Sequence, residues 1–149
     1  MIKASMYFAY GRNARPGLSA ATTFEAILRG ERTSTTRFPN WPGHARWVQA
    51  RPGDVVRFYE DRAMQGRFVD CVITAVPAEI DLANCGAETL AAWSQAEGWS
   101  EKAGRGYGQR YGRGVQVRYR LKDASPASAD ASAPTPAAPP ARPRDLLDF

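Results

Sequence analysis

Two arginines and a run of hydroxyl side chains lie close together in residues 32–37, and they are the first candidates for chemistry in this chain. Arg37 could bind an anionic ligand through its guanidinium, or it could pair with an acid such as Asp54. A strand over this run would point Thr35 and Arg37 to one side and their neighbours to the other. One strand face and the turn that carries Arg32 therefore predict a binding cleft.

The segment 105–113 is a second candidate, because it reads RGYGQRYGR and interleaves three arginines and two tyrosines with glycine and glutamine. Arginines can hold phosphates while tyrosines stack on bases, so the segment suits a flexible contact with nucleic acid. Arg105 and Tyr107 are the expected contacts. The alternative is a frayed helix whose tyrosines close the sheet.

Two tryptophans, Trp41 and Trp47, lie in a long segment, 39–52, that is predicted as a loop. Each could be a stacking platform for a base or could pin the loop to the core, and we take Trp41 as a ligand contact. The sole histidine, His44, has no cysteine or histidine beside it, and the two cysteines lack the spacing of a zinc site. The sequence thus predicts neither a metal nor a cofactor.

The elements that position these side chains follow from hydrophobic patterns and turn residues. Thr22 and Glu25 form a capping box that begins a helix, and Gly30 ends it. Alternation over 115–121 predicts a strand with one buried face. The predicted elements are helices over 22–30 and 87–96 and strands over 6–10, 33–38, 55–59, 67–76 and 115–121. This set suggests an α+β fold with a small barrel-like sheet.

The 149 residues divide into two unlike parts near residue 123. Residues 1–122 carry 18 basic and 11 acidic side chains, whereas residues 123–149 carry two basic and four acidic ones. Residues 124–143 hold six of the 11 prolines and no aromatic or large aliphatic residue, too little apolar surface to offset the chain entropy of folding. We expect one domain over 1–122 and a disordered tail over 123–149. Its tip, Asp145–Phe149, is either frayed chain or a docking peptide for a protein partner.

The excess of positive charge indicates which class of partner the chain could bind. Of the 20 basic residues, 17 are arginine. Arginine holds phosphates and planar bases through a fixed fork, so a polyanionic partner is plausible, although a GC-rich genome would also favour arginine codons. The sequence has no apolar run long enough for a membrane span, and its first residues lack the apolar core of a signal peptide. These features predict a cytoplasmic protein without a membrane partner.

Several short motifs, in order along the chain, resemble the signature of the ASCH family, which has the PUA-like fold. That signature has a glycine, a lysine two residues on, a threonine or acid three later, and an arginine two after that. The matching positions are Gly30, Arg32, Thr35 and Arg37, followed by Gly53-Asp54 before an apolar strand and Glu97-Gly98 at a helix end. The resemblance covers about residues 5–122 and implies a small PUA-like β-barrel with two or three short helices.

The resemblance also implies a function. ASCH domains are proposed to bind RNA or nucleotides in a cleft lined by the signature, and some are amidohydrolases that remove the acetyl group from acetylcytidine. Their catalytic lysine, threonine and acid fall by position on Arg32, Thr35 and Glu97. Arginine keeps its proton, so Arg32 could hold a ligand or an oxyanion but could not activate Thr35 as a base, a role that Glu97 could take over.

The sequence therefore predicts a protein that binds RNA, a nucleotide or a modified nucleoside in a basic cleft. The expected ligand contacts are Arg32, Thr35, Arg37, Trp41, Glu97, Arg105 and Tyr107. One alternative is a hydrolase acting on acetylated cytidine-type nucleosides or on RNA, with Arg32, Thr35 and Glu97 as its catalytic residues. Another is an adaptor that docks a nucleic-acid-processing partner through its C-terminal tail.

Overall fold

The computed structural model describes residues 1–8 and 13–123, so the predicted tail and its tip Asp145–Phe149 lie outside the described residues. The elements, in chain order, are β1 (Ile2–Tyr7), α1 (Thr23–Leu28), β2 (Ser34–Arg37), α2 (His44–Val48), β3 (Val55–Tyr59), β4 (Phe68–Ile73), β5 (Ala78–Ile80), α3 (Ala87–Glu97), α4 (Glu101–Tyr111) and β6 (Gly114–Leu121).

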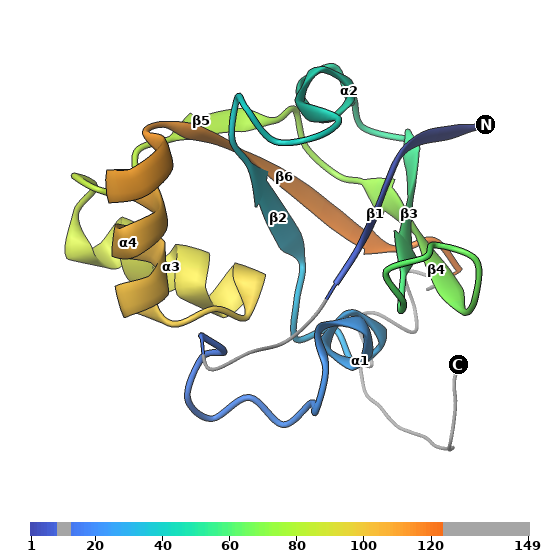
Figure 1. The fold of residues 1–149 in the computed structure, drawn as a ribbon, viewed down its shortest axis with the longest axis horizontal. Coiled ribbons are helices and arrows are strands. Elements are labelled where there is room, and N and C mark those ends of the chain that lie inside the picture. The colour runs from blue at the N-terminus through green and yellow to red at the C-terminus, as the bar shows by residue number, and fades with distance from the viewer. Residues whose placement is uncertain (9–12, 124–149) are drawn as a thin grey trace.

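The strands form one curled, six-stranded sheet in the order β1-β3-β4-β6-β2, with β5 paired to β6 (Figure 1). The β1–β3 pair is parallel, and the other pairs are antiparallel. Figure 1 shows α3 and α4 together on one side of the sheet, with α2 at the top and α1 at the bottom of the view. The α+β prediction and its barrel-like sheet are confirmed. No helix in the described part of the chain is long and apolar enough to span a membrane.

The core forms because β3 alternates buried and half-buried residues, as a strand with one covered face does. Its Phe58 ring lies 4.7 Å from the ring of Tyr119 on β6 and 6.0 Å from that of Trp47 on α2. Trp47 is therefore a core residue. It pins its segment to the core, which was the alternative to a stacking platform for a base. A second buried group, which includes Leu90 and Trp93 of α3, fills the space under α3 and α4.

The structure corrects the predicted elements in four places. The first strand covers Ile2–Tyr7 and not 6–10, of which residues 9 and 10 lie outside the described residues. Residues 39–52 are not only loop, because α2 lies within them. The strand β5 was not predicted, and its three residues are too few to give a pattern. The structure also has four helices in its described residues where two or three were expected.

The fourth helix, α4, occupies most of the segment predicted as a flexible nucleic-acid contact. Ser100 caps it by accepting a hydrogen bond from the backbone N–H of Ala103, which is an ordinary helix start signal. Two glycines of this helix permit close packing, namely Gly104 and Gly108, of which Gly108 belongs to the segment predicted as flexible. A Cβ at Gly104 would lie 2.7 Å from the Trp93 ring, and one at Gly108 would lie 2.2 Å from the Ala83 backbone.

Candidate ligand-binding site

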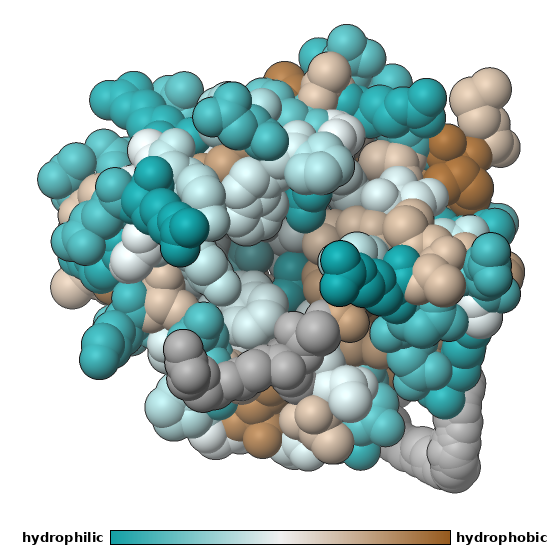
Figure 2. Space-filling view, in the orientation of Figure 1, coloured by the Kyte–Doolittle hydropathy of each residue, from teal (hydrophilic) through white to brown (hydrophobic). Residues whose placement is uncertain are grey.

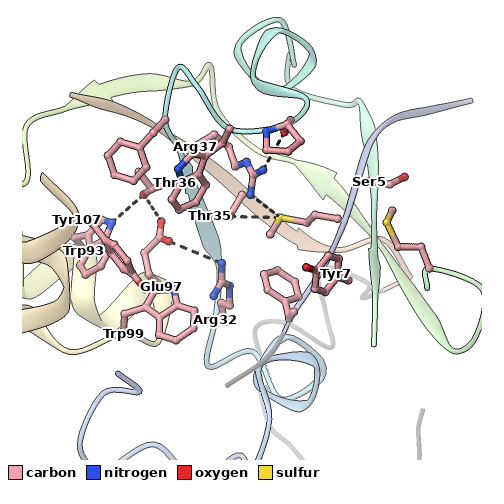
Figure 3. Close-up of a pocket in the computed structure, with 16 residues that line it drawn as sticks. Ser5, Tyr7, Arg32, Thr35, Thr36, Arg37, Trp93, Glu97, Trp99 and Tyr107 are labelled. Atoms are coloured by element: carbon pink, nitrogen blue, oxygen red, sulfur yellow. Dashed lines mark hydrogen bonds and ion pairs between the residues drawn. The ribbon is translucent and has the colours of Figure 1, made fainter. Parts of the chain in front are cut away.

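A cavity of about 390 Å³ lies between β1 and β2, the two strands at the ends of the sheet order. Figure 2 shows a hollow in the middle of this face of the molecule. The polar side chains in its wall are Ser5, Arg32, Thr35, Thr36, Arg37 and Glu97. The cavity thus collects all four signature-derived site residues, Arg32, Thr35, Arg37 and Glu97, from two separate parts of the chain (Figure 3).

Arg32 lies in the turn between α1 and β2, and its side chain is 3 % exposed. Its Nε donates to the Tyr119 hydroxyl at 3.2 Å, and its Nη2 lies 3.9 Å from Oε1 of Glu97. The guanidinium carbon stacks 4.3 Å from the centroid of the Phe8 ring. Its Nη1 is buried without a hydrogen-bond partner. A buried charged donor without a partner is costly, so this nitrogen is a candidate contact for an acceptor on a ligand.

Glu97 is the last residue of α3 and is 1 % exposed. The backbone N–H of Thr33 donates to the carbonyl of Ala96 at 2.7 Å, which ties the start of β2 to the end of α3. This tie brings the carboxylate to the strand. Oε2 of Glu97 accepts hydrogen bonds from the hydroxyls of Ser34 at 2.7 Å and Thr36 at 2.8 Å.

The directions of these two hydroxyl bonds are fixed by their outer partners. Trp93 Nε1, which can only donate, gives its proton to the Thr36 hydroxyl at 2.9 Å, so that hydroxyl must donate onward to Glu97. Gln116 Nε2 donates to Ser34 in the same way at 3.0 Å. Because Oε2 receives two donors, any proton on the Glu97 carboxyl must sit on Oε1.

The pKa of Glu97 is raised, because burial disfavours the carboxylate more than Arg32 and the two hydroxyls stabilise it. Its free oxygen, Oε1, can therefore act as an acceptor when the group is ionised and as a donor when it is protonated. In either state this oxygen is the part of Glu97 that is available to a ligand.

Arg37 ends β2 and is 7 % exposed. Its Nη2 donates to the carbonyl of Pro42 at 3.0 Å, its Nη1 donates to the Met6 sulfur at 3.5 Å, and its Nε is buried without a partner. Burial and the nearby charge of Arg32 lower the pKa of Arg37 to about 10. The salt bridge with Asp54 that was one interpretation of Arg37 is not formed, since the Asp54 carboxylate accepts from the backbone of Arg51.

Thr35 lines the cavity, but its hydroxyl does not contact Glu97. It donates to the sulfur of Met6 at 3.7 Å, on the face of β2 that it shares with Arg37. The threonine that contacts the acid is Thr36. The strand alternation predicted from the sequence is thus correct, and it separates Thr35 from the carboxylate with which it was grouped as a catalytic residue.

Aromatic rings form most of the remaining wall. Trp41 and Tyr107, both expected as ligand contacts, line the cavity with their rings edge to face at 6.4 Å. The other aromatic residues of the wall are Tyr7, Phe8, Phe38, Trp93 and Trp99. These walls can hold a flat ring, because aromatic faces stack on planar groups.

Arg105 is the expected ligand contact that the structure places elsewhere. It is in α4 beside the second buried group, and its Nη1 donates to the carbonyls of Leu82 at 3.1 Å and Cys85 at 2.8 Å. Its guanidinium therefore holds the chain after β5 against the helix. The residue does not line the cavity, whereas Tyr107, two residues on, does.

Several cavity residues were missed by the sequence reasoning. Met6 and Phe8 come from β1 or its end, and Trp99 comes from the turn between α3 and α4. These are apolar side chains that a core would also use, so only the three-dimensional arrangement marks them. Thr36 could have been identified from the sequence, because it is next to the signature threonine, Thr35.

The described residues hold no group of three or more histidine, cysteine or acidic side chains that could bind a metal ion. The donors around the cavity are guanidinium, hydroxyl and indole groups with a single carboxyl. Such a set suits an organic ligand rich in acceptors better than a cation.

No family model matches the chain, and no curated protein is similar to it at a significant level. A search of solved structures finds the ASCH domain from Lactobacillus crispatus JV V101. The TM-score is 0.49 at 13 % identity, and the match covers 79 % of this chain and 78 % of that one.

Proposed function

We propose that this chain binds a nucleotide or a modified nucleoside, free or within RNA, by enclosing its base in the cavity between β1 and β2. The observation that carries the proposal is the pair of buried guanidiniums in the cavity wall, each with a nitrogen that has no partner, Arg32 Nη1 and Arg37 Nε. Buried donors of this kind are satisfied when an acceptor-rich ligand enters.

The size and walls of the cavity fit a base. A volume of 390 Å³ is within the range of about 300–1,000 Å³ typical of small-molecule sites. The aromatic side chains around it offer stacking surfaces, and stacking on a base contributes about 1–3 kcal/mol per ring. Trp41 is half-buried and belongs to this wall, so it is positioned to cover a bound ring.

Arg32 and Glu97 give the cavity a donor beside an acceptor. Arg32 Nη1 is a donor without a partner, and Oε1 of Glu97, 3.9 Å from Nη2 of the same guanidinium, is the free oxygen of the carboxyl. Nucleobases present a ring or carbonyl acceptor next to an N–H donor on their pairing edges. The pair is therefore suited to recognise such an edge.

The hydrolase alternative has less support from this geometry. Its predicted set of Arg32, Thr35 and Glu97 lines one cavity, but the Thr35 hydroxyl donates to the Met6 sulfur and has no base beside it. A nucleophilic hydroxyl needs a base within hydrogen-bond reach. Thr36 does touch Glu97, but its hydroxyl is held between Glu97 and Trp93.

The test is a titration of the full chain with the common ribonucleosides, acetylcytidine and a short single-stranded RNA at low salt, followed by tryptophan fluorescence. At least one of these probes should bind, and Trp41→Leu should weaken binding by about 1–3 kcal/mol because it removes a stacking surface. Phe68→Leu, which changes an exposed aromatic outside the cavity wall, is the matched control and should leave binding unchanged.

No binding of any probe, or equal weakening by both variants, would contradict the proposal. Chromatography of the acetylcytidine and RNA samples after incubation separates binding from hydrolysis. Turnover that Glu97→Gln abolishes would establish the hydrolase in its place.

A further inference from the structure

We propose that Arg37 and Thr35 form a subsite for a phosphate group, and that the thioether of Met6 occupies this subsite until a ligand phosphate displaces it. The inference rests on the proposed function and deepens it, because it names the ligand as a nucleoside monophosphate and not an uncharged nucleoside.

The bonds of Arg37 show that its guanidinium is short of partners. Nη2 donates to one carbonyl, that of Pro42, while Nε donates to nothing and Nη1 reaches the sulfur of Met6 at 3.5 Å. A thioether is only a weak acceptor. Two of the three nitrogens of this cation thus lack a good acceptor. Because Arg37 is only 7 % exposed, the bulk solvent does not supply one.

Thr35 points its hydroxyl at the same sulfur, at 3.7 Å. Figure 3 shows the contacts of Arg37 and Thr35 meeting at this one atom. Two donors from one strand face therefore converge on a point that a poor acceptor fills. A phosphate oxygen at that point would accept from both, and charge-assisted hydrogen bonds are about twice as strong as neutral ones.

The balance of charge in the cavity wall favours an anion. Arg32 and Arg37 contribute two guanidiniums, and Glu97 is the carboxyl that faces them. Burial raises the pKa of Glu97, which weakens its compensation of the two cations. Burial, and to a smaller extent the nearby Arg32 charge, also lowers the pKa of Arg37, as expected for a buried cation beside a second cation.

Met6 is able to give way. It belongs to β1, which pairs with β3 and stands at one end of the sheet order among the described residues, and its side chain lies in the cavity wall. Methionine is unbranched with several rotatable bonds, which lets the sulfur leave without a shift of the backbone. Arg37 also lies over the Trp41 ring at 5.2 Å, which holds the guanidinium in place while the thioether moves.

The experiment compares each ribonucleoside with its 5′-monophosphate, and with inorganic phosphate, by calorimetry on the full chain. For the base that binds, the monophosphate should bind at least about ten-fold more tightly than the nucleoside, the gain expected for a charge-assisted contact. Arg37→Gln should abolish most of that gain, measured as the ratio of monophosphate to nucleoside affinity within the same variant. Arg113→Gln, an exposed arginine paired with Glu79, is the matched control and should keep the gain.

A second measurement follows Met6 directly. The chain has three methionines, so a protein labelled with ¹³C at the methionine methyl groups gives few signals, and Met6→Leu assigns the one of interest. Monophosphate should shift the Met6 signal well beyond the shift that the nucleoside causes. Thr35→Val, which removes one donor without changing side-chain size, should reduce the gain in affinity if Arg37→Gln proves too unstable to use.

The outcomes separate this inference from the proposed function. A nucleoside that binds as tightly as its monophosphate, or a gain that survives Arg37→Gln and Thr35→Val, overturns the phosphate subsite and leaves base binding intact. A Met6 signal that moves equally with nucleoside and monophosphate overturns the displacement. Binding of inorganic phosphate alone, with no nucleoside or nucleotide bound more tightly, overturns both.

Discussion

The polar groups on the two faces of β2 differ in how completely they are hydrogen-bonded. On one face, Ser34 and Thr36 are saturated, since each hydroxyl receives one hydrogen bond and passes one to Glu97. On the other face, Thr35 and Arg37 both donate to the sulfur of Met6, and Arg37 has one further acceptor, the carbonyl of Pro42. All four residues of the strand are buried, so the contrast is not one between a wet face and a dry one.

The contrast teaches which buried polar groups serve the fold and which are held for a ligand. A saturated network rigidifies its surroundings, because breaking any bond leaves a buried group unpaired. An undersaturated cation has the opposite meaning, since the fold gains little from it until an acceptor arrives. On this basis we assign Glu97, Thr36 and Trp93 to holding the cavity in shape, and we propose that Arg37 and Thr35 contact the ligand.

The largest expected effect comes from removing the acid on the saturated face. Glu97→Ala leaves the hydroxyls of Ser34 and Thr36 without an acceptor and Arg32 without its carboxyl partner. Breaking a buried pair in this way costs about 3–5 kcal/mol of unfolding free energy. Urea denaturation measures the change. Glu88→Ala, on the exposed side of the same helix, is the control and should stay within about 0.5 kcal/mol.

A destabilisation from Glu97→Ala no larger than the control would mean that the hydroxyl network does not support the fold. The contrast between the faces of β2 would then be lost, because neither face would contribute to stability.

A more direct comparison uses the same substitution at neighbouring positions. Thr36→Val removes the acceptor of the Trp93 indole and a donor to Glu97, and should cost about 1–3 kcal/mol of unfolding free energy. Thr35→Val removes only a contact with sulfur, and should cost less than about 1 kcal/mol. Valine suits a strand at both positions, so the propensity for β structure cancels between them. Equal costs in urea denaturation would refute the division between the faces.

Much of this arrangement follows from the sequence, and its limits have physical reasons. The strands β3, β4 and β6 were predicted because β-branched and aromatic residues alternate in them or follow a clear turn. The capping box at Thr22 and Glu25 was predicted as well, and the Thr22 side chain accepts from the backbone of Glu25 at 3.1 Å. Local signals of this kind depend on neighbours in the chain.

The sequence predicted which residues line the cavity better than it predicted the hydrogen bonds between them. Arg32, Arg37 and Glu97 do line one cavity, but β2 is buried on both faces, so the sequence had no polar–apolar alternation to show which threonine meets the acid. The role of Met6 depends on a contact between strands at opposite ends of the sheet order. Arg105 was misplaced because Gly104 and Gly108 allow tight helix packing, which composition alone does not distinguish from flexibility.

The smallest expected effect is the pH dependence that Glu97 adds to stability. Its pKa is raised in the folded chain above the ordinary value of about 4.3 that it has when unfolded. Between these two values the folded state holds a proton that the unfolded state has released. Its contribution is therefore fully present below the ordinary pKa and is lost as pH rises through the raised one.

Glu97→Gln keeps the shape of the neutral acid but cannot titrate. The difference in unfolding free energy between the unchanged chain and this variant should shift in favour of the variant as pH increases from about 4 to 8. Urea midpoints across that range give the difference, and the other carboxyls cancel because both proteins carry them. Parallel curves would show that Arg32 and the two hydroxyls stabilise the carboxylate in the folded chain as well as water does in the unfolded chain. The acid would then already compensate one of the guanidiniums, and the cavity would demand less negative charge from its ligand.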